Sequence, residues 1–204
     1  MARAIGLMVA IEGVDAVGKR TQSILLDSRL RSMGFKSNTM SFPDYGTTIG
    51  REIREYLHGK RAYSLEVGHM LYAINRWEKK GVITDILGIS DALIINRYSP
   101  SNLAYGVAKG LKLEWLANLE KGLPDADLVV VLDAPPSALT SRRTANKDDY
   151  ERDMELQERV RTAYLRLARD FSWVVIDAAR SKTETNDDLV SAVTKALAAG
   201  GGMR

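Results

Sequence analysis

A glycine-rich turn near the N-terminus constrains this chain more than any other segment. Residues 13–19 read Gly-Val-Asp-Ala-Val-Gly-Lys, and they follow the apolar run Ile5–Ile11. A buried strand, such a turn and a helix start together present backbone N–H groups to an anion, while the lysine reaches the outer phosphates. We therefore expect a nucleotide-phosphate loop made of Gly13, Val14, Asp15, Ala16, Val17, Gly18, Lys19, Arg20 and Thr21.

One usual feature of such a loop is missing. The position after the lysine commonly holds a Ser or Thr whose hydroxyl binds Mg²⁺. Here that position is Arg20, and Thr21 follows one place later. The sequence thus predicts a phosphate site that lacks the usual metal ligand.

Five short segments have the character of buried strands. They are Ile5–Ile11, Ser37–Phe42, Ala92–Ile95, Leu128–Leu132 and Trp173–Ile176. All but the second are continuous apolar runs, as is typical of a parallel sheet covered on both faces. Because helical patterns separate them, we predict an α/β fold with a doubly wound, five-stranded parallel sheet flanked by helices. Its ligands should lie at the carboxyl ends of the strands.

Apolar stripes at helical spacing support this fold. Leu26, Leu30 and Met33 form one stripe, with Gly34 where a C-terminal cap belongs. Others run through residues 156–167 and 189–197, and we expect Asn186 to be the N-cap of the last helix. We expect residues 1–204 to form a single domain.

Composition narrows the possible functions. The 204 residues include no cysteine, which excludes disulfides and thiolate metal sites. No apolar stretch approaches the about 20 residues that span a bilayer, and the N-terminus lacks the pattern of a signal peptide. We therefore expect a cytoplasmic protein without a membrane partner. The net charge of +3 fits small phosphorylated ligands better than nucleic acid, because no basic block with interleaved aromatics occurs.

Two further segments carry residues suited to binding a phosphorylated ligand. Arg97 follows the third predicted strand, where a guanidinium can bind a second phosphate with two hydrogen bonds. Position alone equally allows a surface arginine paired with a helix carboxylate. Tyr72 and Arg76 share one helix face, with Asn75 beside them. A ring that stacks on a base and a donor for its carbonyl would form a base pocket, although simple packing also produces this spacing.

A charged stretch follows the fourth predicted strand. It contains Arg142, Arg143 and Lys147 and leads into a helix. We expect a lid near residues 140–152 whose cations close over transferring phosphates, with a solvated loop as the alternative.

Five segments in this order resemble thymidylate kinases over nearly the whole chain. They are Glu12–Thr21, Phe42–Gly46, Asn96–Tyr105, Trp115–Asp127 and Asp149–Asp153. The resemblance implies a P-loop kinase fold and phosphorylation of dTMP to dTDP, with ATP as donor and Mg²⁺ as cofactor. It also implies a homodimer.

The resemblance also assigns roles. Asp15 would contact the sugar 3′-hydroxyl, Pro43 would line a pocket for the thymine methyl group, and Tyr105 would crowd the sugar 2′ position. The implied dTMP site comprises Asp15, Phe42, Pro43, Tyr45, Tyr72, Asn75, Arg76, Arg97, Asn102 and Tyr105. Within it, Tyr72 would stack on thymine, Arg76 and Asn102 would read its polar edge, and Arg97 would bind the acceptor phosphate. The implied catalytic residues are Lys19, Arg97, Arg142, Arg143 and Lys147.

Two departures from the family pattern weaken the metal site. Arg20 replaces the hydroxyl residue, and Asn96 replaces the aspartate of the family's Asp-Arg-Tyr motif. Asp15 and Glu151, with Tyr45, are the remaining candidates for holding Mg²⁺. Two other functions stay open: a P-loop deoxynucleoside or nucleotide kinase with Asp44 as base, and a nucleotide-binding protein that has lost catalysis.

Overall fold

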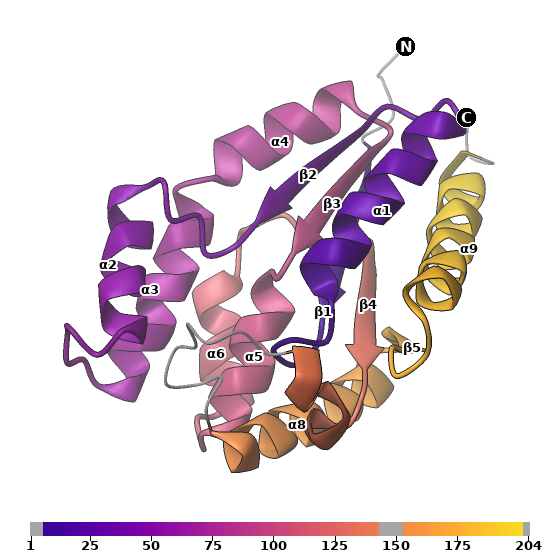
Figure 1. Ribbon diagram of the computed structural model, residues 1–204. Helices are drawn as coiled ribbons and strands as arrows, with labels where there is room; N and C mark the ends of the chain where they lie inside the picture. The colour runs from indigo at the N-terminus through magenta and orange to yellow at the C-terminus, as the bar shows by residue number, and fades with distance from the viewer. Residues whose placement is uncertain (1–5, 143–152, 202–204) are drawn as a thin grey trace.

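The computed structural model describes residues 6–142 and 153–201, and its centre is a parallel five-stranded sheet (Figure 1). The strand order is β2-β3-β1-β4-β5. The strands are β1 (Leu7–Glu12), β2 (Ser37–Ser41), β3 (Ala92–Asn96), β4 (Leu128–Asp133) and β5 (Val174–Asp177). This confirms the predicted sheet, with strand ends that differ from the predicted ones by at most two residues.

Helices cover both faces of the sheet. They are α1 (Lys19–Ser32), α2 (Thr48–Leu57), α3 (Leu65–Trp77), α4 (Lys80–Ile89), α5 (Ser99–Ala108), α6 (Leu113–Glu120), α8 (Met154–Asp170) and α9 (Lys182–Gly201), with a 3₁₀ segment η1 at Pro136–Arg142. α1 and α9 pack together on one face, and α4, α5 and α8 lie on the other (Figure 1). α2 and α3 form a pair beside the carboxyl ends of β2 and β3.

The central strand β1 explains why the apolar runs are continuous. β1 lies between β3 and β4, and residues Met8–Ile11 are fully buried. Val9 and Ile11 pack with Leu26 and Leu30 in one hydrophobic cluster, whereas Met8 and Ala10 belong to a second cluster that includes helix α4. A strand covered on both faces has no side chain that needs water, so no alternation is required.

Two expectations about helix ends require correction. Asn186 is not an N-cap: α9 begins four residues earlier, where Ser181 and Glu184 form a reciprocal capping box. Asn186 is instead buried and donates to Gln22 Oε1 at 2.9 Å, joining α9 to α1. Met33 does not continue the apolar stripe of α1, because it stands at the C-cap and is 54% exposed. Across the described residues, no helix has the length and apolar character needed to cross a membrane.

Candidate active site

The predicted phosphate loop joins β1 to α1. Gly13 has φ +134°, and a Cβ there would lie 2.4 Å from the Leu132 carbonyl oxygen of β4, so only glycine fits. Gly18 has φ +108° and caps the start of α1. Lys19 Nζ donates to the carbonyls of Gly13 (2.9 Å) and Val14 (2.7 Å). The lysine ammonium is thereby held across the loop, at the positive end of a helix.

A cavity of about 560 Å³ opens over this loop. Its lining includes the stretch from Asp15 to Gln22, the carboxyl end of β3 and the segment after β5. Arg180 and Lys182 come from that last segment. Backbone N–H groups and several cations therefore surround one space large enough for a nucleotide.

Arg97 lies where β3 ends and has an unusual backbone conformation. Its φ is +63°, a region that non-glycine residues seldom adopt, and its N–H donates to the Ile11 carbonyl at 3.1 Å. Its guanidinium forms an ion pair with Asp15 of the loop and lies 5.3 Å from the ring centre of Tyr105. The alternative of a surface arginine paired with a helix carboxylate is therefore wrong.

Asp15 accepts hydrogen bonds from three side chains of the site. Besides Arg97, it accepts from the Tyr105 hydroxyl at 2.7 Å and from Gln157 Nε2 at 2.9 Å. Burial alone would raise its pKa, but Arg97, Lys19 and these hydrogen bonds together hold the pKa below its usual value. Asp15 is thus a carboxylate at neutral pH. Gln157 lies in the first turn of α8, next to Leu156 at the start of the apolar stripe, and no sequence motif marks it.

A second cavity of about 460 Å³ adjoins the first. Nine of the ten residues of the predicted acceptor site line it: Asp15, Phe42, Pro43, Tyr45, Tyr72, Arg76, Arg97, Asn102 and Tyr105. The Phe42–Pro43 peptide bond in this wall is cis. Asp15, Arg20, Asn96 and Arg97 line both cavities. The two sites therefore meet around the Arg97–Asp15 pair.

One wall of the second cavity is a buried polar network. Arg76 pairs with Glu120 through Nε (2.9 Å) and Nη2, and Asn102 Nδ2 donates to the same carboxylate at 2.7 Å. His69 Nδ1 lies 2.6 Å from Asn102 Oδ1. All four side chains are at most 9% exposed. Sequence reasoning missed Glu120 and His69, because both are single polar residues within helices.

Comparison with known proteins identifies the family. The family model for thymidylate kinase matches residues 11–189. The chain belongs to the thymidylate kinase family.

Relatives of known name match nearly the whole chain. The thymidylate kinase of Schizosaccharomyces pombe is 34% identical over 93% of this chain and 92% of its own length. That of Danio rerio is 36% identical over 90% of this chain and 88% of its own. The solved structure of the Candida albicans thymidylate kinase superposes with a TM-score of 0.84 at 28% identity, covering 96% of this chain and 95% of that one.

One residue assigned from the family resemblance lies elsewhere. Asn75 was expected in the base pocket, but it is fully buried and does not line either cavity. Its side chain accepts from the Asp44 N–H at 2.8 Å and donates to Thr47 Oγ1 at 2.9 Å. Asn75 therefore holds the turn after β2. Asn75 lies on the side of α3 that contacts this turn, whereas Tyr72 and Arg76 face the cavity.

Asp44, the base required by the deoxynucleoside kinase alternative, is also placed elsewhere. It forms an ion pair with Lys79 at 2.7 Å and accepts from the Gly46 N–H. It is not among the residues that line the acceptor cavity. The alternative thus loses its one candidate for a catalytic base.

Asn96 lies at the position where the family resemblance leads us to expect an aspartate. Among the described residues, Asn96 Oδ1 is the only buried side-chain acceptor or donor without a hydrogen-bond partner. Asn96 Nδ2 lies 3.5 Å from Ser41 Oγ. The described part of the chain holds no group of three or more His, Cys, Asp or Glu residues that could hold a metal ion. Arg143, Lys147 and Glu151 lie outside the described residues, as does the side chain of Arg142, so their roles stay predictions.

Proposed function

We propose that this protein transfers the terminal phosphoryl group of ATP to dTMP. An oxygen of the dTMP phosphate would attack the γ-phosphorus, and the bond to the ADP oxygen would break. The observation that carries this proposal is the pair of adjoining cavities, one over the phosphate loop and one lined by Tyr72 and Arg76, which share Arg97. Family membership supports both substrates.

The proposed mechanism rests on alignment and charge. Lys19, anchored by two loop carbonyls, would contact the outer phosphates of ATP, and the loop N–H groups would cradle them. Arg97 would bind the acceptor phosphate from the boundary between the cavities. Two phosphates held in line by fixed cations gain from proximity and from stabilisation of the transferring group. The lid expected near residues 140–152 would add cations, and it remains a sequence prediction.

Selection of the deoxy sugar is assigned to Tyr105. Its hydroxyl is tied to Asp15 at 2.7 Å, and its ring packs edge-on against Tyr164 at a centroid distance of 6.4 Å. A side chain fixed at both ends cannot move aside for an additional hydroxyl. We therefore expect Tyr105 to exclude a 2′-hydroxyl.

We also propose that the reaction uses Mg²⁺. Asp15 supplies a carboxylate and Asn96 Oδ1 an unpartnered carbonyl oxygen, and both line the phosphate cavity. Oxygen ligands of this kind suit Mg²⁺, which usually keeps several waters and takes its other ligands from phosphates. When bound, the ion would neutralise phosphate charge.

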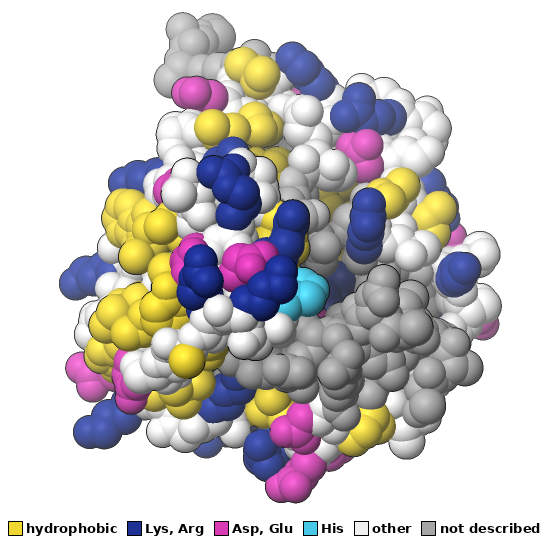
Figure 2. All heavy atoms as spheres, turned by 60° about the vertical axis from the view of Figure 1, so that its left-hand side comes forward, with side chains coloured by type: hydrophobic (Ala, Val, Ile, Leu, Met, Phe, Trp, Pro, Cys, Tyr) yellow, Lys and Arg dark blue, Asp and Glu magenta, His cyan; other side chains and the backbone are white. Residues whose placement is uncertain are grey.

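A homodimer is the proposed assembly. Val67, Met70, Ile74 and Trp77 form an exposed stripe on α3, at 37–44% exposure, whereas His69, Tyr72 and Arg76 line the cavity from the opposite side of the same helix. Hydrophobic side chains gather on this side of the molecule (Figure 2). An apolar stripe of this length is typical of a contact between subunits, and a second copy is the occupant that family membership favours. The cytoplasmic location stays a prediction.

A panel of nucleoside monophosphates tests the activity. With ATP and Mg²⁺, dTMP should be turned over and its 2′-hydroxy counterpart should be a far poorer acceptor. Binding of dTMP and ATP without turnover would support the lost-catalysis alternative. Equal rates for both sugars would remove Tyr105 from sugar selection.

A further inference from the structure

The hydrogen bonds around Asn102 determine which ring nitrogen of His69 carries a proton. Asn102 Nδ2 lies 2.7 Å from Glu120 Oε1 and 3.3 Å from the His69 carbonyl oxygen. A backbone carbonyl oxygen can only accept a hydrogen bond. The Glu120 carboxylate, which is paired with Arg76, is also an acceptor. The amide nitrogen must therefore face them, and Asn102 Oδ1 is the atom at 2.6 Å from His69 Nδ1. Because Oδ1 cannot donate, the proton lies on Nδ1.

The other ring nitrogen, Nε2, is consequently an acceptor. Nε2 has no hydrogen-bond partner among the described residues, and His69 lines the acceptor cavity. Burial lowers the pKa of His69 to about 4, so the ring is neutral at physiological pH. The cavity wall thus offers a fixed lone pair rather than a titrating group.

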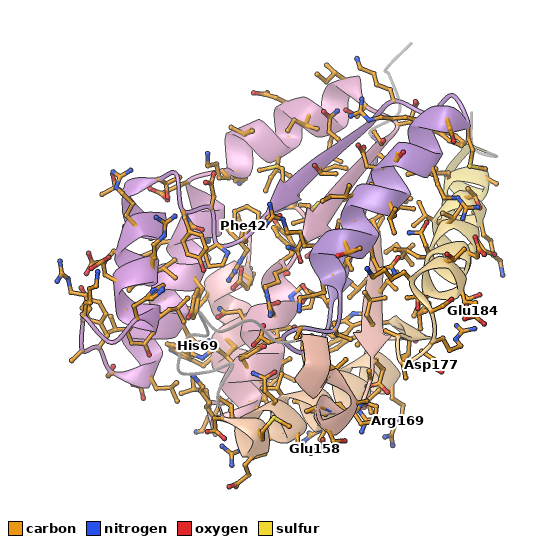
Figure 3. All side chains as sticks on the ribbon, viewed as in Figure 1. Phe42, His69, Glu158, Arg169, Asp177 and Glu184 are labelled. Atoms are coloured by element: carbon orange, nitrogen blue, oxygen red, sulfur yellow. The ribbon has the colours of Figure 1, made fainter. Side chains whose placement is uncertain are left out.

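Arg76 supplies a donor to the same cavity. Its Nε and Nη2 are committed to Glu120, which leaves Nη1 without a partner among the described residues. His69, Tyr72 and Arg76 project from the same side of α3, and all three line the cavity. His69 comes from α3, and Phe42, which lines the same cavity, comes from the end of β2 (Figure 3). One wall therefore carries one donor and one acceptor, with an aromatic ring between them in sequence.

Asn102 itself has little left to offer a base. Its amide nitrogen has two protein acceptors and its oxygen already accepts from His69. We therefore look for the residue that reads the base edge in His69, which Asn102 orients, rather than in Asn102 itself.

We propose that His69 is a base-selecting residue, whose Nε2 accepts the N3–H of thymine while Arg76 donates to the adjacent carbonyl. This inference rests on the proposed dTMP kinase function. Cytosine presents a lone pair at N3 and an amino group at the neighbouring carbon, so acceptor would face acceptor and donor would face donor. Buried polar groups left unpaired in this way are the strongest source of discrimination between similar ligands.

Two variants of His69 separate base reading from support of Asn102. His69→Asn places an amide nitrogen near the position of Nδ1, so it can still donate to Asn102, but it has no atom at the position of Nε2. His69→Gln places its amide near Nε2 and loses the bond to Asn102. We expect the Kd for dTMP to rise about tenfold in His69→Asn, in line with loss of a hydrogen bond. We expect it to stay within about threefold of wild type in His69→Gln.

A matched ligand sharpens the test. 5-Methyl-dCMP keeps the methyl group and the sugar of dTMP and differs only at the N3 edge. The wild type should prefer dTMP by at least about hundredfold, and His69→Gln should bind 5-methyl-dCMP better than wild type, because its amide can turn to donate. Wild-type binding of dTMP by His69→Asn, or an equal loss in both variants, would overturn the proposal.

A measurement on the unaltered protein avoids dependence on variant folding. The chain has two histidines, so ¹⁵N signals of the imidazoles can be assigned with His58→Gln. We expect the signals of His69 to show the Nδ1–H tautomer, and Nε2 to shift on addition of dTMP but not of 5-methyl-dCMP. An unchanged Nε2 signal with saturating dTMP would refute the contact. Absence of dTMP phosphorylation by the wild type would instead refute the proposed function.

Discussion

At the scale of single residues, Arg97 joins the two halves of the site. Its backbone is held at φ +63° and its side chain pairs with Asp15 where both cavities meet. We expect Arg97→Ala to lower kcat/KM for dTMP at least hundredfold, because loss of a bidentate charged contact costs a few kcal/mol. Arg97→Lys should retain only part of the wild-type kcat/KM, because lysine lacks the planar guanidinium that forms two parallel hydrogen bonds.

Steady-state kinetics on both Arg97 variants test this expectation. Arg166→Ala serves as the control, because Arg166 is exposed on α8 and lines neither cavity. A kcat/KM near the wild-type value in Arg97→Ala would contradict the assignment of the acceptor phosphate.

Asn96 stands where the family resemblance leads us to expect an aspartate. Its Oδ1 is a neutral oxygen without a partner, so it offers Mg²⁺ one weak ligand and no charge. We expect Asn96→Asp to lower the free Mg²⁺ concentration that gives half-maximal rate, with the KM for dTMP largely unchanged. Rates measured against free Mg²⁺ at fixed ATP decide this, and superimposable curves would remove position 96 from the metal site.

At the scale of elements, α3 lines the acceptor cavity with one side, through Tyr72 and Arg76. Its other side carries the exposed apolar stripe that includes Met70 and Ile74. Ile74 is 44% exposed in that stripe. We expect Ile74→Glu to convert the proposed dimer to a monomer, because a buried unpaired charge at a subunit contact is strongly unfavourable. Light scattering after size exclusion measures the mass. Ile24→Glu on α1, where Ile24 is 58% exposed, is the matched control and should leave the mass unchanged. A monomeric wild type would contradict the prediction.

At the scale of the whole molecule, the sequence predicts those features that depend on local sequence patterns, namely the sheet and the residues at strand ends. The runs around Met8–Ile11 predicted the sheet, and the loop residues and Arg97 follow strand ends, so their grouping follows from topology. Glu120, His69 and Gln157 could not be found in this way. Each is a polar residue inside a helix whose role comes from a partner far away in sequence, as with Gln157 and Asp15, 142 residues apart. Only three-dimensional packing pairs them.

The same burial makes overall stability depend on pH. The pKa of His69 is about 4 in the folded chain, chiefly because of burial, against an ordinary value of 6.5. As the pH falls, the His69 side chain therefore becomes protonated near pH 6.5 in the unfolded chain but only near pH 4 in the folded chain. This contribution to the free energy of unfolding is complete above pH 6.5 and is lost as the pH falls to 4, for a total of about 3 kcal/mol.

We expect urea unfolding to show this loss in the wild type and in His58→Gln, whose histidine is exposed. In His69→Gln, stability should change little between pH 6.5 and 4.5, even though it starts lower. An equal pH slope in His69→Gln and wild type would show that other groups cause the loss.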